Sequence, residues 1–211
     1  VVSEDYSGGL AEVKAQVLAG NVTWNLVDVE LSDAVRGCDE GLFETIDASI
    51  LPDGSDGSSA ADDFLPGTIT DCAIGNIVWS TIWAYDSTKT SGVESIADFY
   101  DLDKFPGKRG LRKGPKPQLE MALMADGVPA SYVYIVLGTD DGVQRAFDKL
   151  DTIKDSVVWW TAGAQPAQLL ADGEVVMTTA YNGRIFNAVA AEGKPFVINW
   201  DGQIWDLDLW V

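Results

Sequence analysis

A chain of 211 residues with 46% hydrophobic content can bury a substantial core in one or two domains, and no apolar run approaches the roughly 20 residues of a membrane-spanning helix. The formal charge of −19 argues against nucleic acid as a partner, because such binding requires a basic face; it indicates solubility or, alternatively, attraction of cationic solutes. The absence of histidine excludes Ser-His-Asp and Cys-His nucleophiles and every His-based metal site.

The first part of the chain has the pattern of a small α/β unit. Leucine and valine recur at helical spacing over residues 10–19, and Gly20 with Asn21 has the composition of a helix C-terminus. Apolar runs flank this helix. We therefore expect, in order, a strand at 1–4, a loop at 5–9, a helix at 10–19, a strand at 26–29 and a helical turn at 33–38.

Residues 52–63 are dominated by glycine, serine and aspartate, which predicts a solvated loop. The aspartates invite comparison with a calcium site. Their spacing does not fit an EF-hand, which needs alternating ligands, a central glycine and a terminal glutamate. We predict no metal site and no cofactor.

A β-branched and aromatic run at residues 77–85 predicts a strand. Core packing explains its two central tryptophans, Trp79 and Trp83, and ligand contact is the functional alternative. A short helix is expected at 95–100 and a turn at 105–107. Alternation along the strand places five side chains on one face: Ile77, Trp79, Thr81, Trp83 and Tyr85.

A basic segment at residues 108–116 stands out in this acidic chain. Gly110 and Gly114 lack the spacing of a phosphate-binding loop, and no Lys-Ser or Lys-Thr pair follows them. A solvated face is the simpler interpretation. The alternative is a patch at the edge of a ligand site that meets an anionic group. Its cations are Lys108, Arg109, Arg112, Lys113 and Lys116.

The remaining chain alternates helices and strands. Two helices are expected at 117–125 and 140–153, a strand at 157–161 and the beginning of a helix at 168–171. The C-terminal part then predicts a strand at 175–180, a loop at 181–184, a helix at 185–191, a strand at 196–200, a turn at 201–202 and a strand at 204–211. Loops that follow strands in α/β folds commonly hold ligands, and this one carries Tyr181, Asn182 and Arg184.

Taken together, these segments resemble the periplasmic solute-binding proteins of polyamine ABC transporters, the spermidine/putrescine class. The resemblance covers the whole length of the chain, and the order and spacing of its motifs are more specific than any single motif. The segments that carry it are residues 9–14 with 25–32, 98–99 with 105–108, 120–123, 171–175, 181–183, 201–202 and 204–208.

The resemblance implies an α/β fold of the two-lobed periplasmic-binding-protein type II, with three-layer α/β lobes joined by crossing hinge strands. Lobe 1, which is incomplete, is expected at residues 1–76 and 205–211, the hinge strands at 77–82 and 199–204, and lobe 2 at 83–198. Against the family pattern the chain begins inside the second strand and ends inside another, so we expect a fragment that lacks both ends.

The two cysteines, Cys38 and Cys72, are too few for a structural zinc site. The residues alone leave buried thiols and a disulfide equally open. The resemblance implies a periplasmic location, which is oxidising, and therefore favours a Cys38–Cys72 disulfide. Such a bridge would stabilise the fold by roughly 3–4 kcal/mol in the chain-entropy model.

The resemblance also indicates where a ligand binds, and it assigns no catalytic residue. A polyamine site needs carboxylates for ammonium groups and aromatic walls for the methylene chain. The candidate residues lie in the loop at 5–9, at the ends of the predicted strands and after the strand at 175–180. They are Tyr6, Ser7, Glu30, Asn76, Trp79, Tyr181, Arg184, Trp205 and Asp208.

Several positions depart from the polyamine pattern. Two acids of the spermidine-binding members are replaced by Gly114 and Pro117, and an aspartate of the putrescine-binding members is replaced by Arg184. A desolvated guanidinium repels an ammonium, but it binds a carboxylate in a bidentate pair. Arg184 with Asp208 therefore suits an ω-amino acid such as γ-aminobutyrate. If Arg184 instead points away or pairs with Asp206 or Glu30, a polyamine-like ligand remains.

The predicted function is the substrate-binding component of an ABC importer that captures a polyamine such as putrescine or spermidine, with γ-aminobutyrate as the alternative ligand. The expected protein is a periplasmic monomer whose partners are the ligand and a membrane permease. It is not expected to be an enzyme, although Glu30 and Asp208 form an acid pair of the kind that glycosidases use. A sensor domain on the same fold is a further alternative.

Overall fold

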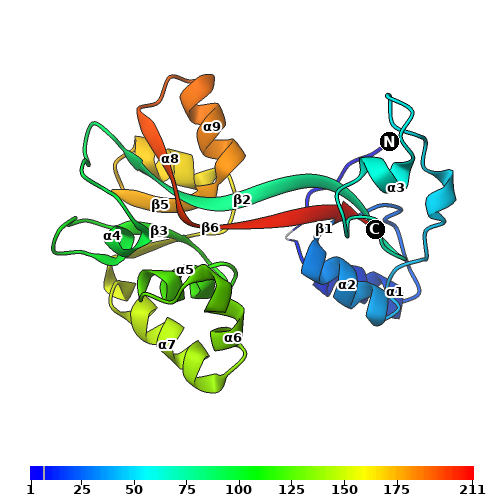
Figure 1. Ribbon diagram of the computed structural model, residues 1–211, viewed down its shortest axis with the longest axis horizontal. Helices are drawn as coiled ribbons and strands as arrows, with labels where there is room; N and C mark the ends of the chain where they lie inside the picture. The colour runs from blue at the N-terminus through cyan, green and yellow to red at the C-terminus, as the bar shows by residue number, and fades with distance from the viewer. Residues whose placement is uncertain (7) are drawn as a thin grey trace. The chain divides into compact units, whose positions relative to one another are not determined.

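The computed structural model describes residues 1–6 and 8–211. The chain forms two compact units: unit 1 comprises Val1–Trp79 and Asp206–Val211, and unit 2 comprises Ser80–Trp205. Two long strands, β2 (Ile74–Asp86) and β6 (Phe196–Trp210), belong partly to each unit (Figure 1). The assignment of these units to lobes joined by a hinge stays a prediction.

Unit 1 is built on a short strand, β1 (Asp28–Glu30), that pairs antiparallel with the end of β6. Val29 lies opposite Leu209, and both side chains are buried in a small core. The helices of the unit are α1 (Ala11–Leu18), α2 (Leu31–Asp39) and α3 (Ala60–Asp63), with a 3-10 turn at Ala48–Ile50. The predicted strand at residues 1–4 is wrong, because those residues form no regular structure.

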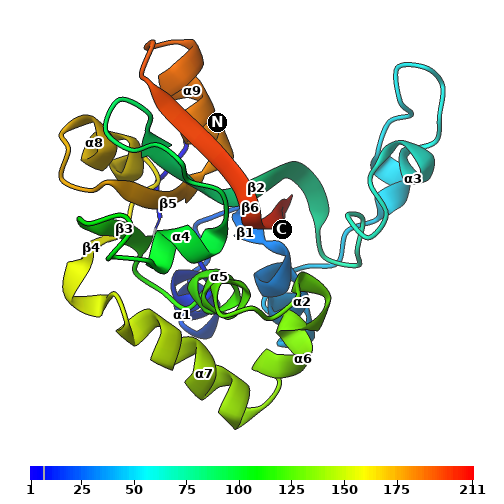
Figure 2. The same cartoon turned by 60° about the vertical axis from the view of Figure 1, so that its left-hand side comes forward.

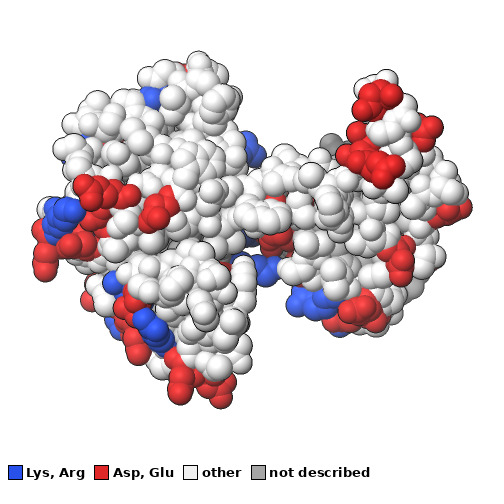
Figure 3. Space-filling view, viewed as in Figure 1, with Lys and Arg blue, Asp and Glu red and all other residues white. Residues whose placement is uncertain are grey.

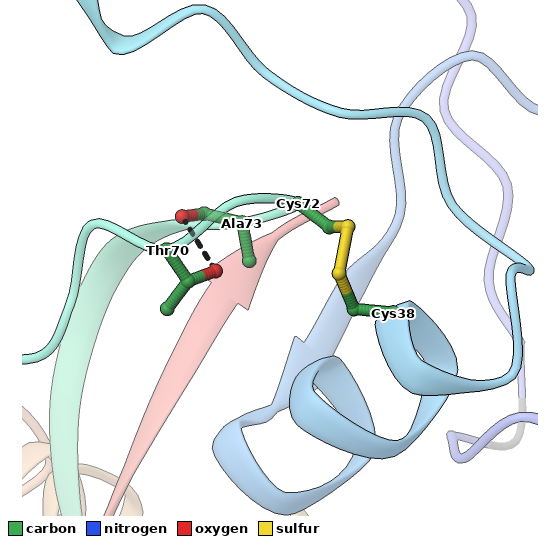
Figure 4. The surroundings of a disulfide bond; sticks show 4 residues. All are labelled: Cys38, Thr70, Cys72 and Ala73. Atoms are coloured by element: carbon green, nitrogen blue, oxygen red, sulfur yellow. Dashed lines mark hydrogen bonds between the residues drawn. A yellow bond between two sulfur atoms is a disulfide. The ribbon is translucent and has the colours of Figure 1, made fainter.

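A disulfide ties this small core together. Cys38, in the last turn of α2, is bonded to Cys72, which lies two residues before β2, and their Cα atoms are 5.8 Å apart (Figure 4). The predicted pairing is therefore confirmed. Beside it the hydroxyl of Thr70 donates a hydrogen bond to the carbonyl of Ala73, which supports the chain as it enters β2.

Unit 2 contains a mixed sheet with the strand order β2-β5-β3-β4. The added strands are β3 (Arg109–Arg112), β4 (Val157–Trp160) and β5 (Met177–Tyr181). β2 runs antiparallel to β5, whereas β3 runs parallel to both β5 and β4. Successive side chains of β2 enter different cores, Ile82 one and Trp83 the other, so helices must cover both faces of the sheet.

The helices of unit 2 fall into two groups. Those on one side of the sheet are α8 (Gln165–Ala171) and α9 (Asn182–Ala190), and those on the other are α4 (Ile96–Tyr100), α5 (Gln118–Ala125), α6 (Val133–Leu137) and α7 (Asp140–Asp151) (Figures 1 and 2). Short 3-10 turns lie at Ala130–Tyr132 and Lys154–Ser156. Among the described residues, no helix combines the length and the apolar character of a membrane span.

Acidic side chains are spread over both units and gather around α3 on the face shown in Figure 3. The segment at 52–63 is mostly loop, as predicted, but its last four residues form α3. Within the described part of the chain, no group of three or more His, Cys, Asp or Glu side chains is arranged to hold a metal ion.

The basic segment at 108–116 is not simply a solvated face, because its second residue is buried completely. Arg109 lies on β3 with 0% exposure. Burial lowers the pKa of its guanidinium to about 10. The group stays buried because it donates hydrogen bonds to four backbone carbonyls, those of Phe99, Gly107, Asp101 and Phe105, at 2.6–3.2 Å.

The turn predicted at residues 201–202 is wrong, because β6 continues through it without reversing. Gly202 has a φ of 73°, which glycine adopts without strain. Asp201 is held by contacts from other elements: its carbonyl accepts from Trp83 Nε1 at 2.8 Å, and its carboxylate accepts from the Ile96 amide at 2.7 Å. These long-range bonds replace the local turn that an Asp-Gly pair usually makes.

Candidate functional site

In unit 1 the candidate residues converge on a group of carboxylates. The indole N–H of Trp79 donates a hydrogen bond to Oδ1 of Asp208 at 2.9 Å. Asp208 lies on β6 directly opposite Glu30 on β1. Burial raises the pKa of Asp208, the Trp79 hydrogen bond opposes that rise, and the nearby charges of Asp28 and Glu30 add to it. An ammonium group placed here would relieve this repulsion.

Tyr6 and Asn76 are held to the same carboxylate group through Asp28. The Tyr6 hydroxyl donates to the Asp28 carbonyl, and Asn76 Nδ2 donates to Asp28 Oδ1 at 2.6 Å. Burial, followed by the charges of Asp28 and other acids, raises the pKa of Tyr6 to about 12. The phenol is therefore a neutral donor at physiological pH. Ser7, also a candidate, lies outside the described residues.

Two neighbours of this group were missed by the sequence reasoning. The ring of Trp24 meets that of Tyr6 edge-on, with centroids 5.4 Å apart. Asp28 accepts hydrogen bonds from Tyr6 and Asn76. Nothing in the local sequence marks either residue, since Trp24 lies in a polar stretch after α1 and Asp28 begins a strand of only three residues. Their roles depend on the fold of unit 1.

In unit 2 the ring of the candidate Tyr181 is contacted by two residues that are not candidates, Trp160 and Arg112. Trp160 packs against it edge-on at 5.6 Å between centroids, and the guanidinium carbon of Arg112 lies 5.8 Å from its centroid. Gly163 makes room for this ring, because a Cβ there would come within 2.9 Å of the Tyr181 ring carbons and within 3.8 Å of Arg184 Nε. Arg112 thus lies beside the ring, and Gly163 leaves room for both the ring and Arg184.

The loop predicted at residues 181–184 does not exist. β5 ends at Tyr181 and α9 begins at Asn182, so Arg184 lies in the first helical turn. Tyr181 supplies no side-chain cap to this turn. The amides at a helix N-terminus carry partial positive charge, which adds to the charge of Arg184 and favours an anionic group. Arg184 itself is exposed.

Trp205 stands apart from both groups. It is the last residue of unit 2 on β6, and its side chain is 65% exposed. In unit 1 a cavity of about 230 Å³ touches only one candidate residue, Asn76. Its other lining residues are mostly apolar, among them Phe64, Leu65 and Leu207, so it does not coincide with the carboxylate group around Asp208.

Residues 1–211 match the family model described as bacterial extracellular solute-binding protein. The chain belongs to this family. The family is one of solute-binding proteins, which agrees with the prediction that the chain is not an enzyme. The predicted mixed α/β fold of the periplasmic-binding-protein kind is confirmed by the family match and by the solved structures of its relatives.

Relatives in this solute-binding family are similar over the entire chain. A gamma-aminobutyric acid-binding protein from Pseudomonas aeruginosa is 50% identical over 211 residues, and the chain spans 58% of that relative's length. The PBP MotA from A. tumefaciens, solved in complex with glucopine, is 34% identical with a TM-score of 0.88, and the chain covers 64% of it. A solved GABA receptor is 35% identical with a TM-score of 0.83, and 62% of it is covered. All three matches cover 100% of this chain.

A polyamine-binding protein is similar to this chain in fold but much less similar in sequence. A spermidine/putrescine ABC transporter substrate-binding protein from Streptococcus pneumoniae has a TM-score of 0.72 but only 13% identity, with 99% of this chain and 62% of that chain covered. That likeness shows the fold alone. The predicted membership in a solute-binding family is therefore correct, whereas its narrower assignment to the polyamine class lacks comparable support.

Proposed function

We propose that the protein is the substrate-binding component of an ABC importer and that its ligand is a small ω-amino acid of the γ-aminobutyrate type. One observation carries this proposal: the candidate residues and their neighbours include carboxylates around Asp208 and, separately, cations beside Tyr181 and in the first turn of α9. An ω-amino acid carries the two matching charges at its ends. The 50% identical relative is named for binding gamma-aminobutyric acid, which supports the same ligand class.

In this proposal the carboxylates of unit 1 bind the ammonium group. Asp208 is the principal partner, because it is partly buried and the indole N–H of Trp79 already orients its Oδ1. Glu30 lies opposite it and adds negative charge. The rings of Tyr6 and Trp79 offer apolar and quadrupolar surface for the methylene groups beside the ammonium.

The guanidinium groups of unit 2 bind the carboxylate. Arg184 supplies a planar donor pair that matches carboxylate geometry, and its place in the first turn of α9 adds the helix dipole. Arg112 adds a second positive charge beside Tyr181. A diamine such as putrescine would place its second ammonium near these cations, where like charges repel. We therefore rank the ω-amino acid ahead of the polyamine.

Calorimetry on the intact protein tests the proposal. The titrants are γ-aminobutyrate, putrescine, spermidine and the two ligands named for related structures, glucopine and agropinic acid. We expect γ-aminobutyrate to bind most tightly and the Arg184→Ala variant to lose at least about 30-fold in affinity, because removing one partner of a charge pair that the bound ligand buries costs about 2–5 kcal/mol. The proposal fails if putrescine binds more tightly or if the variant binds γ-aminobutyrate normally.

A matched control is Arg145→Ala. Arg145 lies on α7 and forms a surface ion pair with Asp126 at 2.6 Å, so its removal changes the net charge of unit 2 by the same amount. We expect γ-aminobutyrate affinity to stay within about twofold, because exposed ion pairs contribute little.

The proposed location is the periplasm and the proposed partner is a membrane permease.

A further inference from the structure

Asn182 occupies an unusual place at the junction of β5 and α9. Antiparallel pairing of β2 with β5 ends at Thr81 opposite Tyr181. One step further, Ser80 would need a backbone acceptor on residue 182, but that residue already belongs to α9. The side chain of Asn182 takes over this function, because its Oδ1 accepts the Ser80 amide at 3.0 Å. The hydrogen bonds between β2 and β5 are thus extended by one that involves a side chain.

Ser80 also binds β6, so it links three elements of unit 2. Its hydroxyl lies 2.8 Å from Gln203 Oε1 and 3.2 Å from the Ile204 carbonyl, both on β6. Ser80 is only 5% exposed, which keeps water from competing for these bonds. The first turn of α9 is therefore tied through Asn182 to a buried junction rather than to a surface strand end.

Trp79, the residue before Ser80, makes a comparable hydrogen bond within unit 1. Trp79 is the last residue of the N-terminal part of unit 1, and Ser80 is the first residue of unit 2. Trp79 donates to Asp208, and Ser80 donates to Asn182, which lies two residues before Arg184. Trp79 is thus bonded to a proposed ligand-binding residue, Asp208. Ser80, the next residue of β2, is bonded to a near neighbour of another, Arg184.

We propose that Asn182 is a positioning residue that holds the first turn of α9 to β2 through Ser80 and thereby sets the direction in which the Arg184 guanidinium is presented. This inference rests on the proposed role of Arg184 as the carboxylate partner. A bidentate pair depends steeply on orientation, so a small tilt of the first helical turn reduces affinity without removing any charge.

The test is a double-mutant cycle on the intact protein with γ-aminobutyrate as the probe. Asn182→Ala is measured in the natural background and in an Arg184→Lys background, in which the charge remains but the planar donor fork is gone. We expect Asn182→Ala to raise the Kd about tenfold in the natural background and less than about twofold in the Arg184→Lys background, because residues acting through one another are not additive. Thermal unfolding is followed for every variant.

Asn187→Ala is the matched control. It removes the same amide from the same helix, but Asn187 is exposed and lies outside the first turn. The affinity of the Asn187→Ala variant for γ-aminobutyrate should match that of the natural protein. If Asn182→Ala does not fold, Asn182→Ser, which keeps a shorter oxygen acceptor, replaces it in both backgrounds with the same expected difference.

Two results overturn the inference. Equal losses of affinity in both backgrounds assign Asn182 to structure alone, and an unchanged Kd in the natural background removes any role. In both cases strong dependence on Arg184 still supports the proposed function. If the natural protein does not bind γ-aminobutyrate, or if Arg184→Lys leaves its Kd unchanged, the proposed function itself fails.

Discussion

Trp79 and Asp208 come from opposite parts of the chain, and the indole N–H of the first lies 2.9 Å from Oδ1 of the second. The bond engages Oδ1 of this partly buried carboxylate. It also counteracts, without cancelling, the rise in the pKa of Asp208 that burial causes. Trp79 is partly buried and supports a candidate ligand-binding acid, and its own contact with a ligand stays a prediction.

Replacing Asp208 with asparagine is expected to stabilise the unliganded protein while it removes ligand binding. The pKa of Asp208 is raised by folding, so the ionised carboxylate costs stability at pH 7, and this cost disappears as the pH falls through the raised pKa. Asparagine keeps the oxygen that accepts from Trp79. We expect a higher melting temperature at pH 7, a smaller difference at pH 4, and at least about a 100-fold loss of γ-aminobutyrate affinity.

Asp151→Asn is the control for this prediction, because Asp151 forms only an exposed ion pair with Lys154. It removes the same charge with little expected effect on melting or binding. Melting curves and calorimetry over this pH range make the comparison. A lower melting temperature for Asp208→Asn at pH 7 would contradict the assigned direction of the pKa shift.

Gly163→Ala is expected to weaken ligand binding with little loss of stability. The added Cβ would lie 2.9 Å from the Tyr181 ring, which must shift, whereas its distance of 3.8 Å to Arg184 Nε is an ordinary contact. We expect about a tenfold rise in the Kd for γ-aminobutyrate, since displacements of this size disturb a preorganised site. Gly183→Ala is the control, because nothing lies within 4 Å of its added Cβ. Similar affinities for the two variants would argue against a ligand-binding role for Tyr181.

Arg109→Lys is expected to destabilise unit 2 strongly. The lysine ammonium cannot reproduce the fork that binds four carbonyls, so buried acceptors lose their donors. We expect a loss of about 3–5 kcal/mol in the free energy of unfolding, because several buried carbonyls lose their donor at about 1–3 kcal/mol each. Urea denaturation measures it, with Arg145→Lys as the exposed control. A loss below about 1 kcal/mol would mean that the carbonyls find other donors.

Removing the disulfide is expected to destabilise unit 1. The bond closes a sequence separation of 34 residues, and in the chain-entropy model the double variant Cys38→Ser/Cys72→Ser loses roughly 3–4 kcal/mol. A reductant should lower the stability of the natural protein to that of the variant and leave the variant unchanged. Sensitivity of the variant to reductant would show that some other effect operates.

Local patterns determined much of the secondary structure from the sequence alone. Apolar spacing predicted α1 and α7 nearly to their observed ends, and the aromatic, β-branched run predicted the centre of β2. The disulfide needed no structural information beyond an oxidising location, because two cysteines allow only one intramolecular pairing. The order and spacing of motifs also led to the solute-binding family.

Tertiary structure decided what local patterns leave open. Arg109 reads as a surface cation until four backbone carbonyls surround it. Asp201 with Gly202 reads as a turn until Trp83 and Ile96 bind Asp201 within a strand. The segment after β5 reads as a loop until the Ser80 amide finds its acceptor on Asn182, which lets α9 begin at once. Arg112 joined the candidate site only through its contact with Tyr181. For Asp201, Asn182 and Arg112 the deciding partner is far away in sequence, so no local window contains the interaction that selects the conformation. The partners of Arg109 are near in sequence, but they surround it only once α4 and the loop after it have folded.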